Sequence, residues 1–146
     1  MESHLNDSRL NQSWWALKLA FGVVPIVAGL DKFFNLLTNW EQYLSPLVSR
    51  VIPASTFMHA VGIIEVAAGL LVLSKLTRVG AYIVSAWLVG IALNLLTTGK
   101  YFDIAVRDLV MAVGAFTLAR LSEARAPASA RERPRAEALR PARTHA

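Results

Sequence analysis

The sequence contains no cysteine, which excludes several kinds of chemistry. With no cysteine among 146 residues, the chain cannot form disulfide bonds, bind a metal through thiolates or use a thiol nucleophile. Histidine is also scarce, because only His4, His59 and His145 are present. These three lie far apart in the sequence, whereas a metal site is built from several converging ligands. No metal site is therefore predicted.

Motifs of soluble enzymes are missing as well. The chain has no glycine-rich phosphate loop, no dinucleotide-binding fingerprint and no Gly-x-Ser-x-Gly nucleophile elbow. It also lacks paired histidines that would hold a haem within apolar segments. No catalytic residue is predicted. These absences favour a role other than that of an enzyme and leave open a role as an accessory subunit.

Charged residues are few, and apolar residues gather in long runs. Only 17% of the residues are charged, against about 25% in an ordinary soluble domain, and 55% are hydrophobic. Four apolar segments have the length that a membrane-spanning helix needs, at residues 14–37, 56–74, 79–98 and 104–121. The expected fold is all-α, a bundle of four transmembrane helices. Between the first two segments, residues 38–55 predict a short interfacial helix.

The segments outside the bundle are polar. Residues 1–13 form an N-terminal arm, and residues 122–146 form a tail rich in arginine, alanine and proline that is predicted to be disordered. The net charge of +5 comes mostly from this tail. It is therefore typical of a membrane flank that meets the lipid bilayer, and no nucleic-acid partner is predicted.

Basic residues predict the orientation of the bundle. With four spans, the side that holds both termini and the second loop carries eleven of the 15 lysines and arginines. Without Arg120 and the six arginines after it, the balance between the two sides is four to four. Because basic residues favour the cytoplasmic side, both termini are predicted to be cytoplasmic.

Glu65 stands in the middle of the second apolar segment, with no other charged residue between Arg50 and Lys75. A charge at that depth costs roughly 2.5–3.5 kcal/mol on insertion scales, a cost that a partner or a polar cavity usually offsets. Gly62, Glu65 and Gly69 fall on one helix face, so Glu65 should point into the bundle. Glu65 therefore marks a candidate site.

The small-residue pattern around Glu65 occurs twice. Residues 20–30 match residues 60–70 at a spacing of 40, with Pro25 in the place of Glu65. Both copies have glycines seven residues apart, on one helix face, which predicts close helix contacts. The repeat is consistent with a duplication, and it is also consistent with the small set of residue types that membrane helices use.

Other polar residues are predicted to gather in the extracytoplasmic half of the bundle. If the first segment runs outward, its outer part carries Asp31 and Lys32, the third segment carries Asn94 in its outer half, and the fourth begins with Arg107 and Asp108. The inner halves are nearly pure hydrocarbon. The predicted pocket comprises Lys32, Glu65, Asn94, Arg107 and Asp108, with Asp31, His59 and Arg78 as possible additions.

Two interpretations of this cluster stay open. Pairing of Lys32 with Asp108, or of Arg107 with Glu65, would simply fix how the helices pack. Alternatively, the cluster forms an outward-facing pocket for a ligand or a proton, floored by Glu65.

Several short motifs carry a family resemblance. Residues 28–33 read Ala-Gly-Leu-Asp-Lys-Phe, and residues 62–71 read Gly-x-x-Glu-x-x-x-Gly-Leu-Leu. Leu-Thr-Arg follows at residues 76–78, before a third apolar segment rich in small residues. Across residues 15–121 the chain resembles the DoxX-like family of small four-helix integral membrane proteins. The positions that match recurring family residues are Lys32, Glu65 and Arg78.

The resemblance implies a location and a set of roles. It implies a multi-pass protein of the bacterial inner membrane, with relatives linked to quinone-coupled oxidation of sulfur compounds or to assemblies that handle oxidative stress. The leading hypothesis is a membrane subunit of a redox or stress-related assembly, next to other membrane or redox proteins or further copies, whose pocket binds a quinone or a small polar ligand. The alternatives are a non-catalytic anchoring subunit and a small solute or ion carrier that acts as an oligomer.

Overall fold

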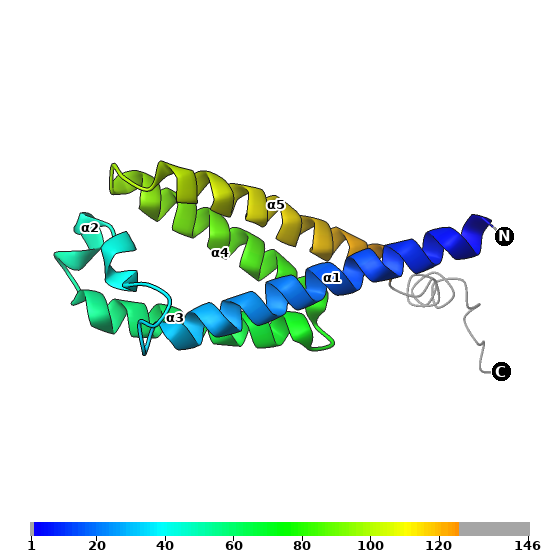
Figure 1. Cartoon of the computed structure of the whole chain (residues 1–146), viewed down its shortest axis with the longest axis horizontal. Coiled ribbons are helices and arrows are strands. Elements are labelled where there is room, and N and C mark those ends of the chain that lie inside the picture. The colour runs from blue at the N-terminus through cyan, green and yellow to red at the C-terminus, as the bar shows by residue number, and fades with distance from the viewer. Residues whose placement is uncertain (1, 126–146) are drawn as a thin grey trace, which may run out of the picture.

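The computed structural model describes residues 2–125, with side chains described from Ser8 onward, and the regular elements of this part of the chain are all helical (Figure 1). The prediction of an all-α fold is therefore confirmed. The elements are α1 (Glu2–Asp31), a single 3-10 turn η1 (Trp40–Tyr43), α2 (Pro46–Ser49), α3 (Ala54–Leu73), α4 (Thr77–Thr97) and α5 (Phe102–Ala124). The two short elements η1 and α2 lie in the loop where a short helix was expected.

Three helices within the described range are long and apolar enough to cross a membrane. They are Ser8–Asp31 of α1, Ala54–Leu73 and Thr77–Thr97. The fourth predicted segment forms α5, which has the length of a span at 23 residues. It is not among the three, and Arg107, Asp108 and Arg120 fall within residues 104–121 of it. The structure thus supports a membrane protein with apolar helices.

The first helix has different limits from those predicted. It begins at Glu2, so most of the predicted N-terminal arm belongs to the helix. It ends at Asp31 rather than at residue 37. The end has a local cause, because the Asp31 carboxylate accepts hydrogen bonds from the backbone N–H groups of Leu36 and Leu37, at 2.9 and 3.1 Å. Just before these two leucines, Asn35 has a φ of 51°, in the left-handed region, which turns the chain away from the helix axis.

The C-terminal tail is partly outside the described residues. Residues 122–124 belong to the last turn of α5. The predicted disorder falls on residues 126–146, which lie outside the described range.

The helices are arranged as two antiparallel pairs, α1 with α3 and α4 with α5 (Figure 1). One end of the bundle, called here the terminal end, holds the α3–α4 turn and the last turn of α5, with α1 passing beside them. The opposite loop end holds η1, α2 and the α4–α5 turn. At the terminal end the Trp14 indole Nε1–H donates to Ser122 Oγ at 2.7 Å, which holds α1 against α5. Toward the loop end the two pairs diverge (Figure 1).

Small residues allow close packing in both pairs. In the α1–α3 pair, Gly29 meets Gly62 and Gly22 lies against the other end of α3 beside Gly69, so the glycines of the sequence repeat face one another. In the α4–α5 pair the packing is dominated by alanine, and the Ser85 hydroxyl donates to the carbonyl of Ala112 at 2.8 Å. The predicted close approach at the glycines is therefore present, and each pair forms a closely packed unit.

Candidate functional site

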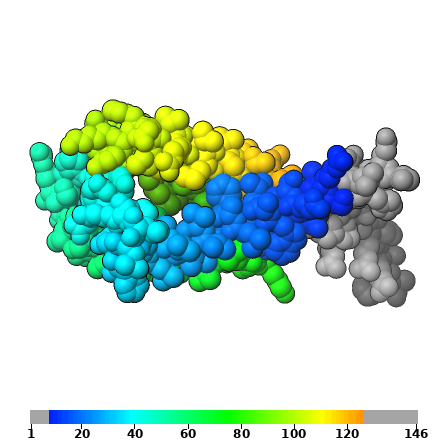
Figure 2. All heavy atoms as spheres, in the orientation of Figure 1, coloured from blue at the N-terminus to red at the C-terminus, as the bar shows by residue number. Residues whose placement is uncertain are grey.

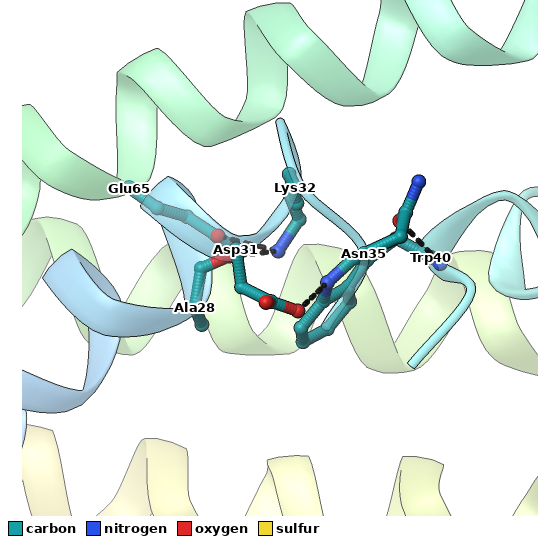
Figure 3. Close-up of polar contacts among 6 residues, drawn as sticks. All are labelled: Ala28, Asp31, Lys32, Asn35, Trp40 and Glu65. Carbon is teal, nitrogen blue, oxygen red and sulfur yellow. Dashed lines mark hydrogen bonds and ion pairs between the residues drawn. The ribbon is translucent and has the colours of Figure 1, made fainter. Parts of the chain in front are cut away.

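An ion pair between Lys32 and Glu65 lies at the centre of the candidate site. Lys32 Nζ donates to Glu65 Oε2 at 2.6 Å, joining the end of α1 to the middle of α3 (Figure 3). The two side chains are only 4% and 9% exposed. A charge-assisted hydrogen bond this short, away from solvent, gives each ion the counter-charge that its burial requires.

Trp40 covers the cation of this pair. Its ring centroid lies 3.7 Å from Lys32 Nζ, in a cation–π contact. The Trp40 indole N–H donates to Asp31 Oδ2 at 2.7 Å, as Figure 3 shows. Asp31 therefore does more than end α1, because it also holds the indole of η1 over the Lys32 ammonium. Ala28 completes the setting of Lys32 with a longer contact from its carbonyl oxygen, at 3.5 Å.

The charged residues of α5 do not form the pairs that the sequence suggested. Lys32 bonds to Glu65 and not to Asp108, and Arg107 is exposed. Asp108 itself is buried, at 7% exposure. Within the described residues it has no hydrogen bond or ion pair, and the charged groups near enough to act on it electrostatically are Arg107 and Glu65. A buried carboxyl group thus faces the ion pair without direct contact to it.

Asn94 and His59 have structural partners. The Asn94 amide accepts from the backbone N–H of Ser45 at 3.1 Å and donates to the carbonyl of Tyr43 at 2.8 Å. It therefore fastens the segment between η1 and α2 onto α4. His59 is exposed and stacks on Phe33, with ring centroids 4.8 Å apart. Neither residue is in contact with the Lys32–Glu65 pair.

Arg78 lies at the other end of the bundle. It is the second residue of α4, in the turn that follows α3, and it is exposed at the terminal end. The structure thus brings Lys32, Glu65 and Asp31 together and sets Arg78 apart from them.

Trp87 adds an unpartnered polar group to the site. Its indole Nε1 is buried and has no hydrogen-bond partner within the described residues. Trp87 lies two helical turns beyond Gly80 on α4, and Glu65 lies two turns before Val72 on the antiparallel α3. Because Gly80 packs directly on the backbone of Val72, Trp87 and Glu65 lie at the same level on facing sides of their helices.

Asp108 shares this level. The hydrogen bond between Ser85 and Ala112 sets the register of α4 against α5. Trp87 is two residues from Ser85 and Asp108 is one turn from Ala112, both toward the loop end, so their depths differ by about 3 Å at 1.5 Å per residue. The polar centre, as we call Lys32, Glu65, Trp87 and Asp108, therefore forms one layer.

The bundle is hollowed where the helix pairs diverge. Figure 2 shows a hollow between α1 and α5, with atoms of the helices behind it at its floor. The polar centre combines a satisfied ion pair, a carboxyl group and an indole N–H that both lack a partner in the described part of the chain. The indole N–H can donate to a ligand, and the carboxyl group accepts from one or, when protonated, donates to it.

Sequence reasoning missed Trp40 and Trp87 as members of this site. Trp40 falls in residues 38–55, which were expected only to carry a short interfacial helix. For Trp87 a signal existed, because Gly80, Trp87 and Asn94 recur every seven residues and so share one face of α4. An indole in that series is placed toward the interior.

Comparison with known proteins gives a single family. The DoxX family model matches residues 13–97. This range runs from α1 to the end of α4, so it includes Lys32, Glu65, Arg78 and Trp87 and leaves out α5 with Asp108. The comparison with curated proteins gave no match, and neither did the comparison with solved structures. Because the matched residues make up more than half of the chain, this protein belongs to the DoxX family.

Proposed function

We propose that the protein is a four-span subunit of the bacterial inner membrane with both termini in the cytoplasm. Three of its helices have the length and composition of spans. The fourth span is α5, whose charged residues Arg107 and Asp108 lie in its first two turns. The basic residues that follow α5 favour a cytoplasmic terminal end, which puts the polar centre in the extracytoplasmic half.

The polar centre, in this proposal, binds the head of a quinone-type ligand. The observation that carries the proposal is the buried Trp87 N–H, which has no hydrogen-bond partner in the described residues. Asp108, a residue 7% exposed and without a hydrogen bond in the same part of the chain, lies beside it at the level of Glu65. An unpaired buried polar group costs about 1–3 kcal/mol. A ligand that supplies the missing hydrogen bonds recovers that cost.

A quinone matches these groups by its chemistry. Its two carbonyl oxygens accept hydrogen bonds, which the Trp87 N–H and a protonated Asp108 supply. Its ring and tail are apolar and reach the hollow between α1 and α5 from the lipid. The Lys32–Glu65 pair adds fixed charges beside the ring while remaining closed. The subunit then holds the quinone in place for a redox partner in the same membrane.

A binding titration with matched variants tests this proposal. The purified protein is titrated with decylubiquinone, and binding is followed by quenching of tryptophan fluorescence and by calorimetry. Trp87→Phe and Asp108→Leu each remove one polar group, and we expect about tenfold weaker binding for each. The controls are Trp15→Phe and Asp103→Leu, which change exposed residues of the same types. Equal loss in the controls, or no saturable binding by the unmodified protein, contradicts the proposal.

An anchoring role without a ligand is the second candidate. It is favoured by the complete coordination of Lys32, whose ammonium already contacts Glu65, the Ala28 carbonyl and the Trp40 ring. In that case the ion pair fixes the packing of α1 on α3 and the helices hold a protein partner. Gentle purification from the native membrane separates the two roles, because a bound quinone supports the first and a stoichiometric partner without any bound small molecule supports the second.

A further inference from the structure

A second polar region lies at the terminal end of the bundle, far from the polar centre. A cavity of about 400 Å³ opens there between α1, the α3–α4 turn and the last turn of α5. Among the described residues, those that line it are Trp14, Lys18, Ser74, Lys75, Thr77, Arg78, Ser122 and Arg125. Four of these are basic and none is acidic. The cavity therefore concentrates positive charge.

Two of the cations share one aromatic ring. The Lys18 Nζ lies 4.8 Å from the Trp14 ring centroid, and the Arg125 Cζ lies 4.2 Å from it. Lys18 is buried, at 8% exposure, and its ammonium donates to the Ser74 carbonyl at 3.0 Å. Arg125 donates to the Asn11 side chain at 2.5 Å. Both partners are neutral, so two like charges are held together around one indole.

The acidic residue closest in sequence to Arg125 is engaged elsewhere. Glu123 accepts from the Tyr82 hydroxyl at 2.9 Å and from Arg120 at 2.6 Å. It is not among the residues that line the cavity. The preference for basic residues on the cytoplasmic side explains the sign of the charges there. It does not explain why a lysine is buried beside an arginine with no acidic residue among the described residues of the wall.

The start of α4 adds further attraction for an anion. This helix of 21 residues begins at Thr77, which lines the cavity together with Arg78, and it has no side-chain cap. The Thr77 hydroxyl donates to the Ser74 carbonyl and so does not cover the helix N-terminus. Free N–H groups and the positive end of the helix dipole favour a phosphate at such a place.

We propose that this cavity is a binding site for a phosphate group, held by Lys18, Lys75, Arg78 and Arg125 beside Trp14. The shared chemistry is that of a phosphate diester or monoester, supplied by the headgroup of an anionic lipid or by free phosphate. The site is separate from the polar centre and does not depend on the quinone proposal.

Native mass spectrometry of the full-length protein in a neutral detergent tests the site. The protein is titrated separately with dioleoyl phosphatidylglycerol, with dioleoyl phosphatidylcholine and with inorganic phosphate. We expect one saturable adduct with phosphatidylglycerol and weaker binding of phosphatidylcholine. Arg78→Gln and Arg125→Gln change exposed residues, so the fold is retained, and each should weaken this adduct about fivefold, as for about 1 kcal/mol per basic residue at a membrane surface.

Matched controls decide between a site and a general charge effect. Arg50→Gln and Lys100→Gln remove exposed basic residues at the loop end. They should leave the adduct unchanged. If inorganic phosphate displaces the lipid from the unmodified protein and fails to do so from Arg78→Gln, the ligand of the site is soluble phosphate. If inorganic phosphate does not displace the lipid from the unmodified protein, the ligand is the lipid headgroup. Equal weakening by the controls, equal binding of both lipids, or full binding by Arg78→Gln and Arg125→Gln overturns the proposal.

Discussion

Gly29 and Gly62 approach each other so closely that a Cβ atom on either would lie 2.5 Å from the carbonyl oxygen of the other. The contact is reciprocal and joins α1 to α3 one turn from the Lys32–Glu65 pair. Gly69 has the same relation to the carbonyl of Gly22 at the other end of the helix pair, at 2.5 Å. The ion pair is thus built on a helix contact that only glycine permits.

Replacing Gly62 with alanine should destabilise the bundle. The nearest atom to the added methyl group is the backbone carbonyl oxygen of Gly29, which cannot turn aside as a side chain can. The helices α1 and α3 must therefore move apart, at a cost of about 1–3 kcal/mol. Gly90→Ala is the control, because nothing lies within 4 Å of a Cβ at Gly90. The free energy of unfolding in mixed detergent micelles measures both. Equal stability of the two variants would show that the close contact is not needed.

Replacing one partner of the Lys32–Glu65 ion pair should lower the free energy of unfolding more than replacing both partners. Glu65→Leu leaves the Lys32 ammonium buried without its counter-charge, which should destabilise the protein by about 3–5 kcal/mol. The double variant Lys32→Met/Glu65→Leu should be close to the unmodified protein in unfolding free energy. As a reference, Arg120→Gln breaks a surface pair with Glu123 and should cost less than about 1 kcal/mol. Additive losses in the double variant contradict this expectation.

The Asp31–Trp40 hydrogen bond should control the order of the loop after α1. Trp40→Phe keeps an aromatic face over Lys32 and removes the indole donor, whereas Asp31→Asn also weakens the bonds to the Leu36 and Leu37 amides. We expect faster hydrogen exchange at these two amides in Asp31→Asn and a smaller increase in Trp40→Phe. Trp15→Phe changes an exposed indole and should leave the exchange rates unchanged.

The absence of cysteine makes the number of spans directly measurable. Single cysteines at Lys75, Lys100 and Ala146 can be labelled with a membrane-impermeant maleimide in right-side-out and inverted vesicles. Four spans place positions 75 and 146 on one side and position 100 on the other. If position 146 is labelled from the same side as position 100, α5 does not cross the membrane.

The sequence predicts most of the helical architecture because apolar runs and glycine spacing report it directly. The Gly62-Glu65-Gly69 face was correctly expected to pack inward, and Glu65 is buried. The end of α1 was placed six residues too late, because apolar residues continue to Leu37 while the helix stops at Asp31. Composition alone cannot show that a carboxylate caps the turn beyond it.

The ion-pair partner of Glu65 could not be predicted from apolar runs and glycine spacing. Helix faces and depth restricted the candidates to basic residues in the outer half, and Lys32 and Arg107 both satisfied that restriction. The choice depends on which helices touch, and α3 packs on α1 and α4 rather than on α5. Long side chains also reach beyond their own level, which lets Lys32 at the end of α1 contact the middle of α3.

The placing of Lys32 has a consequence for biosynthesis. Its counter-charge, Glu65, follows 33 residues later, so the ribosome releases the cation well before its partner. During that interval the indole of Trp40, anchored by Asp31, is available within nine residues. This local arrangement can cover the ammonium before α3 is synthesised, and arrival of α3 then completes the charge pair. The two groups that contact the Lys32 ammonium, first Trp40 and then Glu65, therefore become available in the order in which the chain is synthesised.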